Sequence, residues 1–364
     1  MLIKIDVDSD QYKRIQNLIN DRKYEDIHQF IKIAINNQIQ EEQSSESENN
    51  EIQSESIGDR VQEIIQERQE ELAKLLGAVP LEKSEIEPEH EELISNFYNR
   101  FFPVKLVVST VARLMVQKKT WIELSEVQED ASKFAESVSA MLQDIEEMAK
   151  LPRNEKLSTG LPMTKAEYIG WKGGMRRKKE AKYQSSKVRF MEQFVGRPVG
   201  VHNFKGASFS MGLIGVKFVG DTCLVSLTDN GKEFALIENP IIDMKKYDYL
   251  FSDKEIKLIY KKIISRFPLE YKLVNSIIDK LTKEGSLRSS EIDPLFKEEE
   301  SKIFKFYSSE PQKLSQKRKK DILVQARVGT MGRLSELRIV DWSIDKKGVS
   351  NYNINKDVLS VVNS

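Results

Sequence analysis

The most regular alternation of hydrophobic and polar positions lies between Leu213 and Val225. This stretch is rich in β-branched residues, and the tight-turn pair Gly220-Asp221 interrupts it. Strands favour β-branched side chains at alternating positions, so the pattern predicts a two-stranded hairpin. Asp229-Asn230-Gly231 is expected to turn the chain into a short helix, which Asn239-Pro240 would end.

Helical spacing of hydrophobic residues precedes this hairpin. Residues 96–117 predict a largely buried helix, in which Pro103 is tolerated as an early-turn residue. The sequence WIEL, residues 121–124, predicts a short strand, and an S-x-x-Q pattern from Ser125 predicts a capping box that opens the next helix. A basic helix is expected from Lys172 to Arg189, and the chain then leads through Gly196-Arg197-Pro198 to the hairpin.

The segment after residue 251 follows a similar plan, with helices before a hairpin. An S-x-x-E capping box at Ser252 predicts a first helix, and Pro268 is expected to open a second one. A long helix is predicted to begin at Lys317, and Gly329 and Gly332 are expected to interrupt it.

A second hairpin is predicted over residues 338–354, with its turn at Lys346-Lys347-Gly348. The expected order in residues 93–243 is thus helix, strand, helix, basic helix and hairpin, and in residues 252–358 it is two helices, a long basic helix and a hairpin. This order resembles winged-helix domains, and the resemblance implies that the basic helix enters the major groove of DNA. The expected fold class is mainly α with short β hairpins (α+β).

The first 39 residues predict a separate unit. Alternation over residues 2–8 predicts a half-buried strand, and two amphipathic helices are expected after it. So short a segment buries little core alone, and pairing of two copies is therefore expected. The pattern, including YEDIHQFIKIAI, resembles the ribbon-helix-helix fold, in which the ribbon of a dimer enters the major groove. Lys4 would face DNA there, but phosphates would repel Asp6, so residues 1–39 either contact DNA or serve only for dimerisation.

Residues 40–92 separate this unit from the rest of the chain. Between Glu41 and Glu92, 17 acidic residues stand against 4 basic ones. Residues 40–57 predict a disordered linker, residues 59–76 an amphipathic helix, and residues 78–92 an exposed linker. Because the whole chain has no net charge, the residues outside this acidic segment carry an equal positive excess.

Two basic helices are the main candidates for contact with DNA. Lysine and arginine side chains neutralise phosphates, and this contact does not depend on base sequence. The alternative for such charge runs is a solvated helix face. The candidate DNA-binding residues are Lys4, Arg176, Arg177, Lys178, Lys179, Lys182, Lys187, Arg189, Lys317, Arg318, Lys319, Lys320, Arg327 and Arg333.

No catalytic, metal-binding or cofactor motif is present. His28, His90 and His202 fall in different segments, without a Cys or carboxylate at metal-ligand spacing. No nucleophile elbow, phosphate-binding glycine loop or zinc-ligand spacing occurs, so we predict no metal, no cofactor and no enzyme. A metal-dependent nuclease built on scattered carboxylates would leave no such motif. The single Cys223 falls in a predicted strand and is expected to be a small buried hydrophobic residue.

Three segments together resemble a group of uncharacterised archaeal proteins: Tyr24–Ile35 with Asn37-Gln38, Asn99–Lys105, and Leu227–Pro240. The resemblance implies an intracellular archaeal protein of DNA-binding architecture. No run of about 18 apolar residues and no signal peptide is present, so a cytoplasmic protein is expected.

The sequence thus predicts a homodimer, joined through residues 1–39, that binds double-stranded DNA as a transcriptional regulator or chromosome-organising factor. The rival hypothesis is a protein-interaction scaffold, because winged helices also serve as docking domains.

Overall fold

A computed structural model describes residues 67, 70–89, 91–95, 98–118, 120–152, 155–164, 176–200, 202–346 and 348–363. Apart from Glu67, these residues belong to one compact unit, Arg68–Ser364. The strand and helices expected in residues 1–39 and the acidic linker 40–57 lie outside the described residues. Of the helix predicted over residues 59–76, the structure describes the end, in which residues 70–78 are helical.

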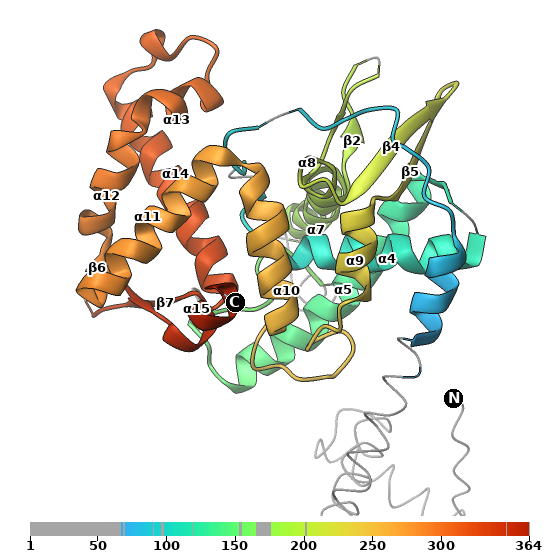
Figure 1. The fold of residues 1–364 in the computed structure, drawn as a ribbon, viewed down its shortest axis with the longest axis horizontal. Helices are drawn as coiled ribbons and strands as arrows, with labels where there is room; N and C mark the ends of the chain where they lie inside the picture. Colours follow the sequence, from blue (N-terminus) through green and yellow to red (C-terminus); the bar gives the residue numbers. More distant parts are fainter. Residues whose placement is uncertain are drawn as a thin grey trace, which may run out of the picture. The chain divides into compact units, whose positions relative to one another are not determined.

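The first half of the unit combines helices with two small antiparallel sheets (Figure 1). Its helices are α4 (Phe102–Lys118), α5 (Leu124–Met148), α7 (Arg176–Phe190), the π-helical turn η2 (Met191–Val195), α8 (Ala207–Ser210) and α9 (Asp229–Leu236). Its strands are β1 (Ile122–Glu123), β2 (Arg197–Pro198), β3 (Phe204–Lys205), β4 (Ile214–Val219) and β5 (Thr222–Leu227).

The hairpin predicted between Leu213 and Val225 is confirmed as β4 and β5. The two strands pair antiparallel from Ile214↔Leu227 to Val219↔Thr222, and Gly220 turns the chain with a φ of 60°. The predicted strand at WIEL is confirmed as β1, which pairs with β5, so the order in the sheet is β1-β5-β4. Cys223 is buried in β5, as expected, and burial raises the pKa of its thiol to about 11.

The entry into α9 explains why the sequence needs glycine at position 231. Thr228 is the N-cap, and its side chain accepts a hydrogen bond from the Gly231 N–H at 3.0 Å. The same hydroxyl donates to the Gly212 carbonyl at 2.7 Å and so fixes the helix beside β4. A Cβ at position 231 would lie 1.8 Å from the Leu213 carbonyl oxygen, so the backbones approach too closely for any side chain.

Of two further local expectations for this half, one is wrong and one is incomplete. The S-x-x-Q capping box does not form, because α5 already begins at Leu124 and Gln128 instead donates to the Gly196 carbonyl at 2.7 Å. Residues 78–92 are not simply an exposed linker. Glu85 N–H donates to the Val216 carbonyl, and Ile86 forms an antiparallel bridge with Val216, so this segment passes beside β4 (Figure 1).

The second half contains a further three-stranded antiparallel sheet. Its helices are α10 (Asp253–Leu258), η3 (Ile259–Ile263), η4 (Ile264–Arg266), α11 (Pro268–Glu284), α12 (Ser289–Glu298), α13 (Glu300–Tyr307), η5 (Pro311–Lys313), α14 (Gln316–Glu336) and α15 (Lys356–Asn363). Its strands are β6 (Ser286–Arg288), β7 (Val340–Ile344) and β8 (Ser350–Ile354), in the order β6-β8-β7. The capping box at Ser252, the start of a helix at Pro268 and the second hairpin are all confirmed.

The expected interruption of the long helix is wrong, because α14 runs without a break from Gln316 to Glu336. Gly329 and Gly332 lie in its buried half. The Gly332 carbonyl accepts a hydrogen bond from Arg100 at 2.9 Å. Burial of this half of α14 therefore offsets the low helix propensity of glycine, which costs about 1 kcal/mol per residue.

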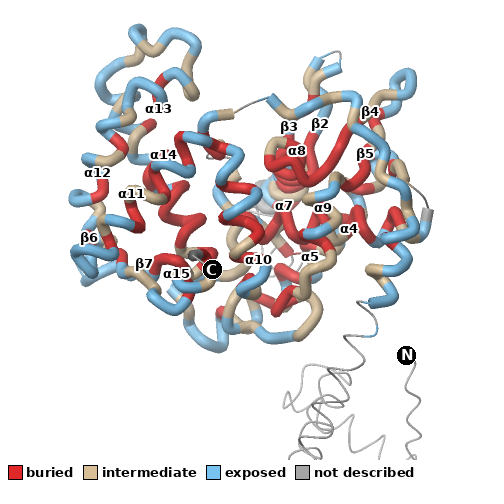
Figure 2. The backbone as a smooth tube through the Cα atoms, in the orientation of Figure 1, coloured by how far each residue is buried: buried red, intermediate tan, exposed pale blue. Residues whose placement is uncertain are grey.

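The two halves share one continuous hydrophobic core, in which α4 is buried along most of its length (Figure 2). Glu336 in the last turn of α14 accepts hydrogen bonds from the N–H groups of Phe101 and Phe102 at 2.7 and 2.9 Å. A side chain from one half thus satisfies the free amides at the start of a helix in the other half. Burial raises the pKa of Glu336, while the charge of Arg100 opposes the rise.

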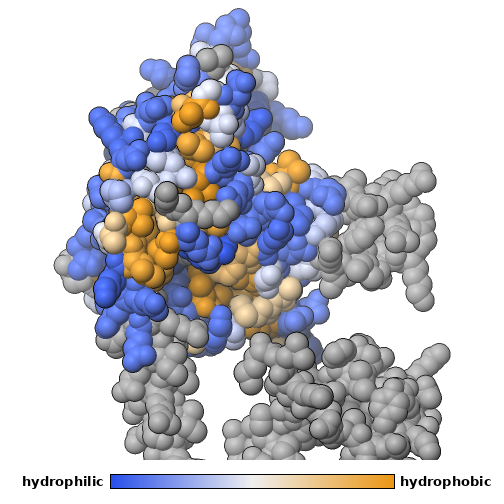
Figure 3. All heavy atoms as spheres, turned by 90° about the vertical axis from the view of Figure 1, so that its right-hand side faces the viewer, coloured by the Kyte–Doolittle hydropathy of each residue, from blue (hydrophilic) through white to orange (hydrophobic). Residues whose placement is uncertain are grey.

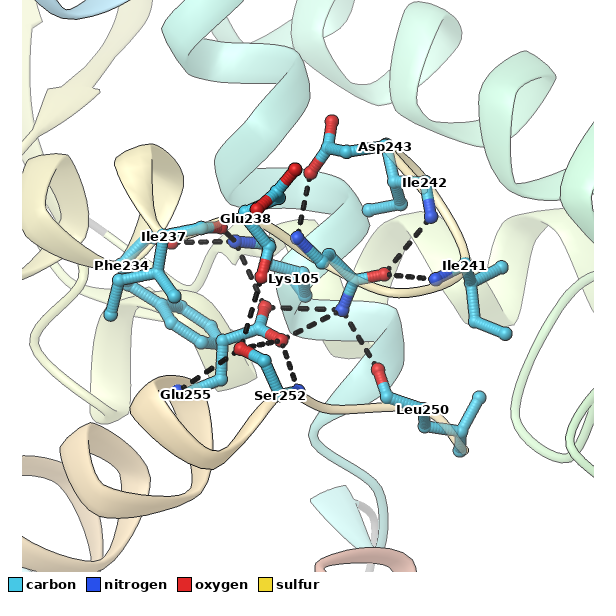
Figure 4. A network of polar contacts seen from close by, with 11 residues as sticks. Lys105, Phe234, Ile237, Glu238, Ile241, Ile242, Asp243, Leu250, Ser252 and Glu255 are labelled. Carbon is cyan, nitrogen blue, oxygen red and sulfur yellow. Dashed lines mark hydrogen bonds and ion pairs between the residues drawn. The ribbon is translucent and has the colours of Figure 1, made fainter. Parts of the chain in front are cut away.

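A second buried polar network lies between α4 and α10 (Figure 4). Lys105 donates to the carbonyls of Phe234 and Ile237, both at 2.6 Å, and forms an ion pair with Glu255. Glu255 also accepts from the Asn239 side chain and from Ser252 N–H. The Asn239-Pro240 stop predicted after α9 is therefore also a structural junction between the two halves.

Candidate nucleic-acid interface

Helix α14 changes character along its length, from an exposed basic half to a buried half (Figure 2). With 21 residues it is about 31 Å long. Ser315 caps its start by accepting a hydrogen bond from Arg318 N–H at 3.2 Å. In the first two turns Lys317, Arg318 and Lys320 are exposed, and Lys319 lies over the Phe304 ring at 5.8 Å from its centroid. Three cations are thus presented to solvent at one end of a firmly capped helix.

The other two predicted cations of this helix lie in a different environment. Arg333 is 2% exposed, and its Nη2 lies 2.7 Å from Glu270 Oε1 on α11. Arg327 is buried too, and its Nε lies 2.7 Å from Asp293 Oδ1 on α12. The sequence prediction placed both at the DNA-facing surface, but the structure uses them to hold α14 against its neighbouring helices. Their charges are compensated inside the protein, so they do not join the exposed cations.

The hairpin β7–β8 follows α14 almost directly. Between them Arg338 adopts a φ of 56° and forms an ion pair with Asp253 at 3.2 Å. Trp342 and Tyr352 face each other across the two strands, with ring centroids 5.8 Å apart. The turn is closed by a hydrogen bond from Asp345 N–H to the Val349 carbonyl, and Lys346 in it is exposed.

Helix α7 holds the other predicted basic run. Arg176, Arg177, Lys178 and Lys179 form its first turn, and further along Lys182 and Arg189 are exposed. Lys4 lies outside the described residues.

Lys187 on α7 is occupied within the protein. It forms an ion pair with Glu136 on α5 at 2.9 Å and lies 5.2 Å from the centroid of the Tyr183 ring. Burial lowers the pKa of Lys187, but the hydrogen bonds with Glu136 and Tyr183 outweigh this and raise it overall. Lys187 therefore anchors α7 to α5.

Two further exposed residues of α14 are hydrophobic and escaped the sequence prediction. Helical spacing correctly places Ile322 and Ala326 in the core. The same spacing turns Val324 and Val328 outward, where they are 37% and 43% exposed. The signal was present in the sequence, because two valines four residues apart lie on the side opposite to the core positions.

Hydrophobic residues elsewhere on the surface are scattered. On the face that looks to the right in Figure 1, hydrophilic side chains cover much of the surface and hydrophobic residues form separate patches between them (Figure 3). Among the described residues the exposed large hydrophobic side chains are Leu75, Met148, Val188, Val219, Tyr271, Val324, Val328, Ile344 and Val349.

A cavity of about 880 Å³ lies between the segment around Glu91, the strands β2 and β3, and α13. Arg197, Lys205 and Lys305 line it together with Glu91 and Tyr98. Glu91 Oε2 is buried and accepts no hydrogen bond from the described residues. Burial and the charge of Glu89 raise the pKa of Glu91 to about 7, and burial and Glu91 raise the pKa of Tyr98 to about 12.

Neither a metal site nor a membrane span is found in the part of the chain that the structure describes. No group of three or more His, Cys, Asp or Glu side chains there is arranged to hold a metal ion. No helix there combines the length and the apolar character needed to cross a membrane. Comparison of the chain with protein-family models, with curated proteins and with solved structures gives no match. The chemistry of the exposed residues themselves is therefore the basis for a functional proposal.

Proposed function

We propose that this protein binds duplex DNA through two winged-helix units, as a transcriptional regulator or a chromosome-organising factor. The main contact in this proposal is the N-terminal half of α14 together with the β7–β8 hairpin. The observation that carries it is the exposure of Lys317, Arg318 and Lys320 on a helix that leads directly into a hairpin.

The strand order of the two sheets supports the winged-helix interpretation. In each half a helix leads into a short strand, and further helices separate that strand from a hairpin. The first half has the additional strands β2 and β3 before its hairpin, and a short helix, α9 or α15, follows each hairpin. The short strand pairs in both cases with the second strand of the hairpin, which gives the orders β1-β5-β4 and β6-β8-β7. This shared strand order is a property of the topology and does not depend on the exact length of any helix. It favours two copies of one architecture, in which α14 takes the place of the groove-facing helix.

The net positive charge of the second unit, residues 252–358, supports binding to the phosphate groups of DNA. Residues 252–358 contain 23 Lys and Arg against 16 Asp and Glu, although the whole chain has no net charge. Glu270 and Asp293 pair with Arg333 and Arg327 of the same unit, so these ion pairs leave its positive excess unchanged. Lysine and arginine left at the surface release counterions when they neutralise phosphates, which drives binding to DNA.

A triple variant tests this proposal. Lys317→Ala, Arg318→Ala and Lys320→Ala together remove three exposed charges from α14, and a salt titration of DNA binding then measures how many counterions are still released. We expect weaker binding to every duplex and a salt slope smaller by about three, one for each lost phosphate contact. The matched control replaces three exposed lysines by Ala and should keep the salt slope. These are Lys254 on α10, Lys261 on η3 and Lys283 on α11.

Equal loss of affinity in both triple variants would contradict the proposed surface. Unchanged affinity in the α14 variant would do so as well, and would favour the rival role of these units as docking domains for a protein. The homodimer through residues 1–39 belongs to the same proposal, because a dimer would present two copies of α14 to one duplex. Sedimentation of the full chain, compared with a chain lacking residues 1–39, tests that part separately.

A further inference from the structure

Two valines interrupt the polar surface of the basic half of α14. Val324 and Val328 are four residues apart, so they lie on one side of the helix with Cβ atoms about 5–6 Å from each other. Lys320 precedes Val324 by four residues and is exposed on the same side. Along this side of the helix, a cation near the start is therefore followed by two hydrophobic side chains.

These valines have no role in the core. Ile322 and Ala326 on the opposite side are 1% and 3% exposed and fill the inward positions of the same turns. β-branched residues also have lower helix propensity than the lysine or glutamate that solvated helix faces favour. A partner that covers the valines would account for both observations.

The surroundings of the valines identify the kind of partner. Of the exposed residues between 316 and 328, three are cations and one, Asp321, is an acid. A protein partner would need a hydrophobic patch inside an acidic rim, whereas duplex DNA offers hydrophobic groups between two rows of phosphates. In the major groove, the hydrophobic group is the C5 methyl of thymine.

We infer that α14 reads A·T base pairs, with Val324 and Val328 in contact with thymine methyl groups. Gln325 is exposed beside them and can donate to N7 and accept from the amino group of adenine. Asp321 can only accept a hydrogen bond, which cytosine and adenine amino groups supply in the same groove. The inference rests on the proposed DNA binding and names the residues that give it a sequence preference.

Removal of only the C5 methyl group of thymine from the DNA is the most direct test. The full chain is titrated with a duplex of alternating adenine and thymine, roughly two helical turns long, and with the same duplex carrying deoxyuridine in place of thymine. Each methyl group buried on binding contributes about threefold to fourfold in affinity, so two contacts predict roughly tenfold weaker binding to the deoxyuridine duplex. A G·C duplex with 5-methylcytosine, which carries a methyl at the same groove position, should bind more tightly than its unmethylated form.

A double variant assigns the effect to the valines. Val324→Ala with Val328→Ala replaces two exposed residues with a better helix former, so the fold is kept, and it should bind both duplexes equally. Leu75→Ala, at a residue 45% exposed outside both units, is the control and should retain the tenfold preference. Equal binding of the unaltered chain to both duplexes would overturn the inference but leave DNA binding intact. Preference retained in the double variant would also overturn it, and no binding to either duplex would overturn the proposed function itself.

Discussion

The Lys105 ammonium lies 3.0 Å from the Glu255 carboxylate, and the two side chains are only 1% and 0% exposed. Lys105 belongs to α4 and Glu255 to α10, so the pair joins the two halves of the described unit. Its remaining hydrogen-bonding capacity is used by two backbone carbonyls on one side and by Asn239 and Ser252 on the other. Burial raises the pKa of Glu255, although the charge of Lys105 opposes the rise.

Replacement of Lys105 should therefore be costly. Lys105→Met leaves the Glu255 carboxylate buried without its counter-charge, and loss of one member of a buried pair costs about 3–5 kcal/mol. Urea unfolding should show this as a large fall in the free energy of unfolding. Lys133→Met is the control, because Lys133 pairs with Glu129 on the exposed face of α5 and should hardly change the midpoint. An equal effect of the two variants would show that the Lys105 pair does not hold the halves together.

Arg333 should behave as a structural residue and not as a DNA contact. Arg333→Gln removes the charge that compensates Glu270 in the interior, and we expect about 3–5 kcal/mol of lost stability. At a temperature where the variant is still folded, the salt slope of its DNA binding should equal that of the unaltered chain. A reduced salt slope in the folded variant would show that Arg333 contacts DNA.

Glu91 should make stability depend on pH in a direction opposite to that of most surface carboxylates. Burial raises its pKa from 4.5 to about 7, so the folded chain keeps this proton where the unfolded chain has lost it. The contribution of Glu91 to stability therefore falls as the pH rises from about 4.5 to about 7 and is constant above that range.

Glu91→Gln removes this titration and keeps the shape of the side chain. Because burial also raises the pKa of Glu255 and Glu336, the comparison must be between the variant and the unaltered chain at each pH. The difference in free energy of unfolding should grow in favour of the variant between pH 5 and 7, as measured by urea unfolding. A difference that is constant across this range would show that Glu91 titrates normally.

Local structure was largely predictable from the sequence where one signal dominates. The hairpins followed from alternation around tight-turn residues such as Gly220, and the capping box at Ser252 formed as predicted. The similar pattern at Ser125 failed, because the strand β1 ends at Glu123 and the helix starts at once. Capping patterns thus predict a helix start only where the preceding chain leaves the cap residue free to adopt an extended conformation.

Long-range relations were beyond the sequence. Glu336 caps α4 across 235 residues, and no local pattern distinguishes it from any other glutamate near a helix end. Arg333 was predicted at the surface for the same reason. A charged residue in a helix sequence does not show that a carboxylate from another helix lies beside it in the core. Gly329 and Gly332 were expected to break α14, but the second half of this helix is buried in the core and stays continuous. The exposed cations Lys317, Arg318 and Lys320 were predicted correctly as surface residues, because residues 316–320 contain no hydrophobic side chain that would bury this turn of the helix.

The most direct test of DNA binding is a salt titration of the full chain against mixed-sequence duplex DNA, followed by fluorescence anisotropy. The three exposed cations of α14 alone predict that log K falls linearly with log salt concentration, with a slope of about −3 or steeper. A shallow slope, or no change in anisotropy at low salt, would contradict the account.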